Sequence, residues 1–243
     1  YTYEWYQNTN PTSFTSTSVM ATETSFNETW TVRVTPNDGY IDGPYTEASV
    51  VIENATPVLS TVTITPNSGV YNDSVLTCSA TATDDDDGSL TPSYEWTVGS
   101  AIYTGSTLDL SSSSAMPLDS VTCTATATDS GSLSVSDSAS VSVENRDPVL
   151  SSISITPNTG ILSDSTLTCL ATVTDDDGES LSPSYEWTSG SNSLGTSDTL
   201  TLTNSSVQPG DVVTCTASVN DNYGGSDSDS ASVSVDNRAP SSP

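Results

Sequence analysis

The residues whose types and spacing could do chemistry in this chain are acidic, and they lie in two runs 91 residues apart. The first run is Asp84, Asp85, Asp86 and Asp87, and the second is Asp175, Asp176 and Asp177, with Glu179 after a glycine. Paired carboxylates can act as acid and base on a glycosidic bond when they face each other across a cleft. Here they lie in a continuous run within a loop, so we expect no enzyme.

Binding of a divalent cation suits these runs better. Carboxylates about 5 Å apart repel by roughly 1 kcal/mol per pair in water, and by several times more at an effective dielectric constant of about 20. The chain opposes them with no lysine, no histidine and only Arg33, Arg146 and Arg238. Ca²⁺ takes about six to eight oxygen ligands, which these residues offer. The alternative, a solvated acidic surface suited to salty surroundings, stays open.

The acidic runs belong to an internal repeat. Tyr-Glu-Trp occurs at residues 3–5, 94–96 and 185–187, and Pro-Val-Leu-Ser occurs at 57–60 and 148–151. We expect an incomplete repeat at 1–56, complete repeats at 57–147 and 148–238, and the start of a next repeat or a linker at 239–243. The incomplete repeat lacks two strands, so we expect a preceding segment of a longer tandem array to complete it.

Strands must position the acidic loops, because apolar residues in each repeat alternate with serine and threonine. Trp96 and Trp187 each lie between two cysteines, and Val32 stands where the first repeat would have its second cysteine. Cysteines on the second and sixth strands with tryptophan on the third indicate an immunoglobulin-like sandwich, in which the cysteines face each other. We expect the disulfides Cys78–Cys123 and Cys169–Cys215. The predicted fold class is all-β: tandem immunoglobulin-like sandwich domains arranged as an extended rod.

In such a sandwich, the loops after the second and sixth strands lie at the end where the linker from the preceding repeat arrives. Acidic or amide residues occupy all of these segments, so we expect structural Ca²⁺ that stiffens each junction. The expected ligands at the first junction are Glu53, Asn54, Asp84, Asp85, Asp86, Asp87 and Asp129. Those at the second are Glu144, Asn145, Asp147, Asp175, Asp176, Asp177, Glu179 and Asp221.

The repeated stretches Thr-Cys-x-Ala-Thr, Tyr-Glu-Trp-Thr and Ala-Ser-Val-Ser-Val resemble tandem Ig-like repeats of giant bacterial and archaeal surface proteins. They are also similar to PKD and cadherin-like modules, although the PKD signature Trp-Asp-Phe-Gly-Asp-Gly is absent. The resemblance covers nearly the whole chain. It implies an extracellular array that serves as a stalk, adhesin or surface filament, and it carries no catalytic residue.

Composition restricts the partners further. A net charge of −28, from 31 acidic residues against three basic ones, argues against nucleic acid and anionic membranes. No run of about 20 apolar residues is present to span a bilayer. Paired cysteines favour an oxidising compartment, so we expect an extracellular or cell-surface location. A disordered chain or a mucin-like stalk would share the composition, but neither explains the alternation.

Short modification signals are present as well. Asn-x-Ser/Thr sequons, which are possible glycosylation sites, occur at Asn27, Asn54, Asn72 and Asn204. Because the chain has no lysine, a lysine–asparagine isopeptide bond is excluded.

Two functions remain in competition. The leading one is a structural protein, in which stiff calcium-bound repeats join further repeats of the same chain, or identical subunits, into a stalk or filament. The alternative is an adhesin whose variable loops bind glycans or another cell surface. Candidate contact residues for the alternative are Tyr40, Tyr45, Tyr103 and Tyr223.

Overall fold

The computed structural model describes residues 1–240, and its regular structure consists of β-strands with two short 3-10 turns, η1 (Ala21–Glu23) and η2 (Leu110–Ser112). The all-β class predicted from the alternation is therefore confirmed. Neither turn in the described part of the chain has the length and apolarity needed to cross a membrane. The end of the predicted 239–243 segment, residues 241–243, lies outside the described residues.

The described chain divides into two compact units whose limits do not follow the repeats. The first comprises Tyr1–Asn67, Val75–Leu108 and Val121–Val141, and the second comprises Ser68–Ser74, Asp109–Ser120 and the chain from Ser142 onward. The domain limits expected from the repeats therefore stay a prediction. Each acidic loop lies in the same unit as the linker that precedes its repeat.

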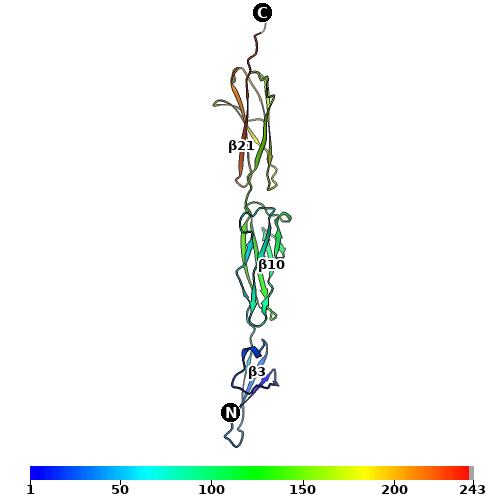
Figure 1. The fold of residues 1–243 in the computed structure, drawn as a ribbon, viewed down its shortest axis with the longest axis vertical. Helices are drawn as coiled ribbons and strands as arrows, with labels where there is room; N and C mark the ends of the chain where they lie inside the picture. Colours follow the sequence, from blue (N-terminus) through cyan, green and yellow to red (C-terminus); the bar gives the residue numbers. More distant parts are fainter. Residues whose placement is uncertain (241–243) are drawn as a thin grey trace. The chain divides into compact units, whose positions relative to one another are not determined.

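The N-terminal repeat, in which β3 is labelled in Figure 1, forms one antiparallel sheet. The order of its strands is β2-β1-β3-β4. Its strands are β1 (Thr2–Gln7), β2 (Asn10–Pro11), β3 (Thr29–Thr35) and β4 (Thr46–Val51). Trp30 is buried between Trp5 and Phe14, with ring centroids 6.4 and 5.9 Å away. The Trp5 indole donates to the carbonyl of Ser16 at 2.9 Å. The segment between β2 and β3 therefore covers part of one face of this sheet, and Val32 is half-buried.

The second repeat has three sheets, in the orders β11-β10-β13-β14, β12-β7-β6 and β5-β8-β9. The first contains β10 (Ser93–Val98), β11 (Ala101–Thr104), β13 (Ser120–Thr128) and β14 (Ser134–Ser142). The second contains β6 (Thr63–Thr65), β7 (Val75–Ser79) and β12 (Thr107–Asp109). The third contains β5 (Val58–Leu59), β8 (Ala82–Asp84) and β9 (Gly88–Leu90).

The predicted second strand of this repeat is broken into β7 and β8. The Tyr94 hydroxyl accepts from the N–H of Ala80 at 3.0 Å and donates to its carbonyl at 3.1 Å. These are the two backbone groups that would otherwise extend the ladder across residue 80. The hydroxyl thus satisfies the two backbone groups of Ala80 at the point where β7 ends and the chain passes to another sheet.

A disulfide links the facing sheets of the second repeat. Cys78 on β7 is bonded to Cys123 on β13, 45 residues later, as predicted. Trp96 is paired with Cys123 across β10 and β13 and is fully buried. Its indole donates to the carbonyl of Gly105 at 2.9 Å. Burying the ring beside the disulfide therefore leaves no indole donor unsatisfied.

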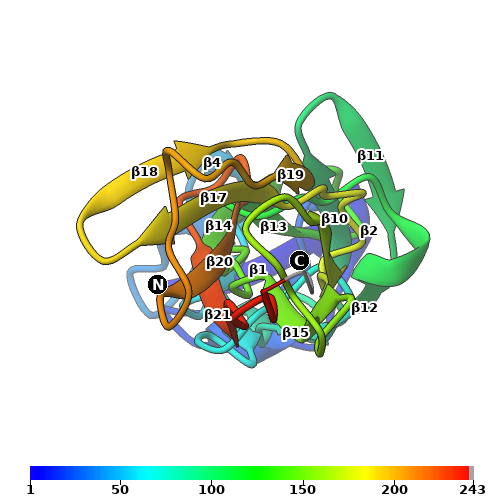
Figure 2. The same cartoon turned by 90° about the horizontal axis from the view of Figure 1, so that it is seen from above.

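The third repeat has two facing sheets. One, in the order β15-β16-β19, contains β15 (Val149–Thr156), β16 (Thr166–Thr174) and β19 (Thr199–Thr201). The other, in the order β18-β17-β20-β21, contains β17 (Ser184–Ser189), β18 (Asn192–Gly195), β20 (Val212–Asn220) and β21 (Ser226–Ser234). In Figure 2 the β17–β18 hairpin reaches outward from the strands of its own sheet.

The core of the third repeat joins the two sheets. Leu167 of β16 belongs to the same buried cluster as Val213 of β20, and Trp187 is fully buried within it. Cys169 is bonded to Cys215, 46 residues later, which is the second predicted disulfide. A sandwich closed in this way brings the loops after β16 and β20 to one end of the repeat.

Strand ends place the acidic residues. Asp84 is the last residue of β8, and Asp129 follows the last residue of β13. In the third repeat, Asp175 and Asp221 follow the last residues of β16 and β20 in the same way. The linker before each repeat enters at these strand ends, because it leads directly into β5 or β15.

Candidate metal sites

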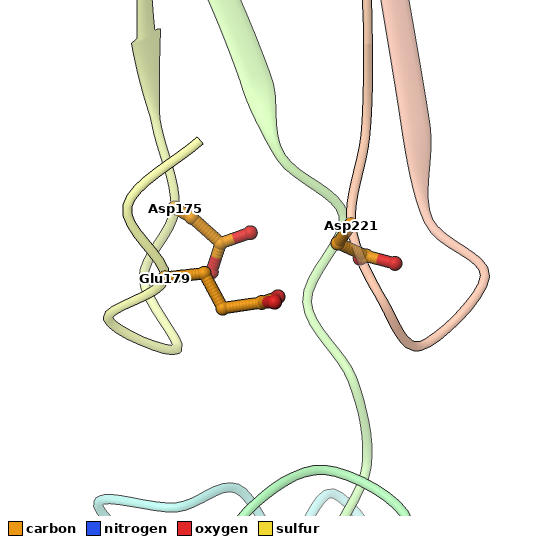
Figure 3. A group of neighbouring side chains, drawn as sticks. All are labelled: Asp175, Glu179 and Asp221. Carbon is orange, nitrogen blue, oxygen red and sulfur yellow. The ribbon is translucent and has the colours of Figure 1, made fainter. Parts of the chain in front are cut away.

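Three carboxylates meet at the linker-proximal end of the third repeat. Asp175, Glu179 and Asp221 each offer an oxygen, and these oxygens all lie within 4.8 Å of one another. Figure 3 shows Asp175 and Glu179 on the loop after β16, facing Asp221 at the end of β20. All three residues are half-buried, so their mutual repulsion is only partly screened by water.

An asparagine of the linker completes this group, which we call the distal cluster (Asn145, Asp175, Glu179 and Asp221). Asn145 Nδ2 donates to Asp221 Oδ2 at 2.7 Å, which leaves Asn145 Oδ1 to face the other way. That oxygen is buried and has no hydrogen-bond partner. The linker therefore supplies an oxygen whose direction is fixed by the bond that its own amide nitrogen makes.

The distal cluster contains two further buried oxygens without partners. Asp175 Oδ1 accepts from the N–H of Asp177 at 2.7 Å, while Asp175 Oδ2 has no partner. Glu179 Oε1 accepts from Asn222 Nδ2 at 3.0 Å, while Glu179 Oε2 has no partner. Each carboxylate is thus held in place by one oxygen and leaves the other unsatisfied.

Asp221 is held as the anion by its surroundings. Burial raises the pKa of Asp221, but hydrogen bonds from Asn145 and from the N–H groups of Tyr223, Gly225 and Gly224 outweigh it and lower the pKa overall. The pKa of the Tyr223 hydroxyl is raised, first by burial and then by the charges of Glu179 and other nearby acids. The electrostatic environment at this end of the repeat is therefore strongly negative.

The same arrangement occurs at the second repeat, in a group we call the proximal cluster (Asn54, Asp84 and Asp129). Asn54 Nδ2 donates to Asp129 Oδ2 at 2.8 Å, and Asn54 Oδ1 is buried without a partner. Asp84 Oδ1 accepts from the N–H groups of Asp86 and Asp87 at 2.8 and 3.1 Å, and Asp84 Oδ2 is buried without a partner. Asp84 and Asp129 are both only 6% exposed.

Unpartnered buried oxygens are concentrated in these two clusters. Among the described residues, every buried side-chain nitrogen or oxygen without a partner belongs to one of them. They are Asn54 Oδ1, Asp84 Oδ2, Asn145 Oδ1, Asp175 Oδ2 and Glu179 Oε2. A buried charged oxygen without a partner is costly, so the arrangement calls for a positive ligand. A donor set of oxygens alone, from carboxylates and one amide, fits Ca²⁺.

Glycines let each linker approach the loop that follows β13 in the second repeat or β20 in the third. A Cβ atom built on Gly131 would lie 2.5 Å from Asn54 Nδ2, which is closer than real Cβ contacts. A Cβ atom on Gly225 would lie 2.6 Å from Asp147 Oδ1 and 3.0 Å from Asn145 Nδ2. A side chain at either position would therefore collide with the linker, so both positions need glycine.

Several predicted ligands form other hydrogen bonds. Asp86 Oδ2 accepts from the N–H of Ala55 at 2.8 Å. Asp87 uses both oxygens on Ser130, at 2.7 Å to its N–H and 2.9 Å to its hydroxyl. Glu144 Oε1 accepts from the N–H of Gly69 at 2.7 Å.

The remaining predicted ligands lie outside the two groups of unpartnered oxygens. Glu53, Asp85 and Asp176 are exposed. Asp147 is also exposed, although it lies close to Gly225. The ligand sets that the structure brings together are therefore smaller than those expected from the sequence.

Asp177 pairs with arginine instead. Its buried carboxylate accepts from the backbone N–H of Arg146 at 2.7 Å and from its Nη1 at 3.1 Å. Arg146 also binds Asp73 at 2.6 Å and stacks on Tyr71, with its Cζ 4.1 Å from the ring centroid. The bond to Arg146 lowers the pKa of Asp73, and the bond to Asp73 is the main cause of the raised pKa of Arg146.

Sequence reasoning missed Asp38, which stands 91 residues before Asp129. Its Oδ1 accepts from the N–H groups of Tyr40 and Ile41 at 2.9 and 3.0 Å. These bonds, led by the one from Ile41, lower the pKa of Asp38. Asp221 makes the same kind of turn, so the repeat spacing alone could have found this residue.

Two of the four sequons are involved in structural hydrogen bonds. Asn54 Nδ2 is bound to Asp129, and Asn72 Nδ2 donates to the carbonyl of Asp177 at 2.7 Å. Glycosylation of either nitrogen would have to break these bonds. Asn27 and Asn204 are exposed, and their glycosylation stays a prediction.

The aromatic residues of the adhesin alternative differ in exposure. Tyr40 is 98% exposed, at the tip of the loop between β3 and β4. Tyr45 is exposed but covered on one face by Arg33, whose Cζ is 4.2 Å from its ring centroid. Tyr103 and Tyr223 are half-buried.

No protein-family model and no curated protein matches the chain. Similar solved structures include three N-terminal domains of the highly immunogenic outer capsid protein of bacteriophage RB49, at 14% identity and a TM-score of 0.32, over 97% of this chain and 88% of that one. A Ca²⁺-stabilised adhesin with which an Antarctic bacterium binds ice has 13% identity and a TM-score of 0.36, over 97% and 64%. EC1-3 of mouse protocadherin-24 has 14% identity and a TM-score of 0.34, over 97% and 89%. Likenesses of this size assign no family to the chain.

Proposed function

We propose that the chain is a non-enzymatic structural segment of an extracellular repeat protein, in which Ca²⁺ ties each linker to the loops of the repeat that it enters. The observation that carries the proposal is the set of five buried oxygens without partners, all of them in the two clusters. A solvated acidic surface would not need to bury any of these oxygens. The two disulfides and the tandem repeats favour an extracellular location.

The residues that would hold the ion are Asn54, Asp84 and Asp129 in the proximal cluster, and Asn145, Asp175, Glu179 and Asp221 in the distal one. The ion supplies the positive charge that the chain lacks. The protein supplies orientation, since each aspartate is fixed by backbone N–H groups and each asparagine by its own aspartate partner. Binding restricts the linker, because its asparagine is then held by the ion as well as by Asp129 or Asp221.

Calcium titration of the full chain tests the proposal. We expect calorimetry to show two bound ions, and the melting temperature to rise when calcium replaces a chelator. At calcium about a hundredfold above Kd, each site would add about 2.7 kcal/mol to the free energy of unfolding. Combining Asp84→Asn with Asp175→Asn should remove both binding events.

Asp137→Asn is the matched control, since Asp137 is an exposed aspartate on β14 outside both clusters. It should bind calcium as the unaltered chain does. Equal melting temperatures in calcium and in chelator would leave only the solvated-surface alternative.

Adhesion is the second candidate, and the loop between β3 and β4 favours it. Tyr40 and Ile41 are 98% and 71% exposed, which is unusual for neighbouring large apolar residues. A role in adhesion predicts that Tyr40→Ser with Ile41→Ser abolishes binding to a glycan array or to cells. Unchanged binding would exclude this loop as the contact.

A further inference from the structure

The proximal and distal clusters share a plan but differ in one carboxylate. Each has a linker asparagine, an aspartate at the end of β8 or just after β16, and an aspartate just after β13 or β20. The distal cluster adds Glu179, with Oε2 buried and unpartnered. Its counterpart 91 residues earlier is Gly88, which has no side chain to offer.

The acidic residue beside Gly88 does not compensate for this difference. Asp87 turns to the neighbouring loop, where both of its oxygens are taken up by Ser130. Glu179 makes the equivalent bridge to Asn222 with Oε1 alone, which leaves Oε2 within the cluster. In the second repeat, Asp87 therefore uses both oxygens to bind the neighbouring loop. In the third repeat, Glu179 binds the neighbouring loop with one oxygen and leaves the other free as a ligand.

We infer that the two clusters bind Ca²⁺ with unequal affinity, that the distal one is the tighter, and that Glu179 sets the difference. This inference rests on the proposed function. Calcium affinity in proteins is tuned by the number of charged ligands and by the rigidity of the site. The distal cluster has three carboxylates against two in the proximal cluster, and each of the three is anchored by hydrogen bonds, Asp175 and Glu179 through one oxygen and Asp221 through both.

The positive charge of Arg146, close to the distal cluster, does not reverse this order of Ca²⁺ affinities. Its guanidinium is bound to Asp73 and Asp177, whose charges offset its own. It makes no ion pair with Asp175, Glu179 or Asp221 among the described residues. The net negative charge that faces an ion in the distal cluster is therefore retained.

Exchange of the two acidic loops tests the inference. Asp87→Gly with Gly88→Glu gives residues 84–90 the sequence that residues 175–181 have naturally. The reciprocal pair, Gly178→Asp with Glu179→Gly, gives the distal loop the proximal sequence. Both are made in the full chain and titrated with Ca²⁺ alone by calorimetry, with Asp84→Asn and Asp175→Asn added singly to assign each binding event. Circular dichroism in chelator checks that each variant is folded.

The unaltered chain should show two binding events whose Kd values differ by about tenfold or more. The tighter event should be lost in Asp175→Asn and weakened by about the same factor in Glu179→Gln. The gain-of-ligand exchange should tighten the weaker event. Two equal Kd values, or an exchange that leaves both unchanged, would overturn the inference while leaving the proposed function intact. A complete absence of binding would overturn both.

Discussion

Arg146 divides its guanidinium between two aspartates of very different exposure. The side chain of Asp177 is fully buried, whereas that of Asp73 is 60% exposed. Exposed ion pairs contribute little because water and salt screen them, whereas a buried carboxylate that loses its cation keeps its desolvation penalty. The bond to Asp177 therefore matters more to the second unit.

Arg146→Ala should accordingly destabilise the protein by about 1.5–3 kcal/mol, the range for a hydrogen bond to a charged group. Asp73→Asn, which removes only the exposed partner, should change the stability little. Urea unfolding in the presence of a chelator would measure both. Equal decreases in the free energy of unfolding of the two variants would show that the buried Arg146–Asp177 pair contributes no more than the exposed one.

Glu28 gives the N-terminal sheet a pH dependence. Its Oε2 accepts from the N–H of Ser25 at 2.9 Å and from the indole of Trp30 at 2.8 Å. These bonds, with that from Ser25 the larger, lower the pKa of Glu28 despite partial burial. Because the folded pKa lies below the unfolded one, the stabilisation is present above about pH 4.5 and is lost as the pH falls through the folded value.

The Trp30 indole N–H resonance should therefore shift as the pH is lowered below about 4.5, and the first unit should lose stability in the same range. An NMR titration from pH 7 to pH 3 would follow both. In Glu28→Gln the shift should be absent. A resonance that titrates identically in that variant would place the responsible group elsewhere.

At the scale of strands and sheets, the disulfides connect facing sheets in the two complete repeats. Each closes a loop of about 46 residues, for which chain entropy gives roughly 4 kcal/mol. Many inward residues of these repeats are alanine, including Ala125 and Ala127, so apolar burial alone is modest. The cross-links therefore supply a large part of the stability of each repeat.

Replacing Cys78 and Cys123 together by alanine should lower the stability of the second repeat by about 4 kcal/mol. Calorimetric scans would show its transition moving to lower temperature while that of the third repeat stays in place. The matched control is Cys169→Ala with Cys215→Ala, which should shift the other transition. A loss of less than about 1 kcal/mol would contradict the dependence on the disulfide.

The sequence was sufficient to predict the strands but not where they are interrupted. Alternation located the strands, and cysteine and tryptophan spacing located the core, because both patterns are local consequences of the pleat. The break between β7 and β8 lies at Ala80, whose backbone groups bond to the Tyr94 hydroxyl, which is a contact across sheets. No local pattern encodes such a contact.

The location of the candidate sites could be predicted from the sequence, but the residues that make up each site could not. The repeat spacing placed the linker asparagines beside Asp129 and Asp221, which they contact, whereas metal binding by either group stays a prediction. Which carboxylates remain free depends on which backbone groups they meet, as Asp86 meets Ala55 and Asp177 meets Arg146. The packing of Phe14 against Trp30 in the first repeat was not predicted either.

At the scale of the whole molecule, a net charge of −28 opposes any compact arrangement of acidic loops. The chain has only three basic side chains, and within residues 1–240 Arg146 is the one that is bound to an acidic loop contributing to a cluster. Both clusters bury unpartnered oxygens despite this repulsion. Cations from the solvent are the remaining source of compensating charge.

The central claim, that these oxygens are calcium ligands, is tested most directly by an anomalous difference map from crystals grown in calcium. We predict one peak bounded by Asn54, Asp84 and Asp129, and another bounded by Asn145, Asp175, Glu179 and Asp221. Both peaks should vanish in crystals treated with chelator. Maps without a peak at either cluster, or with the asparagine Nδ2 groups turned toward Asp84 and Asp175, would contradict the claim.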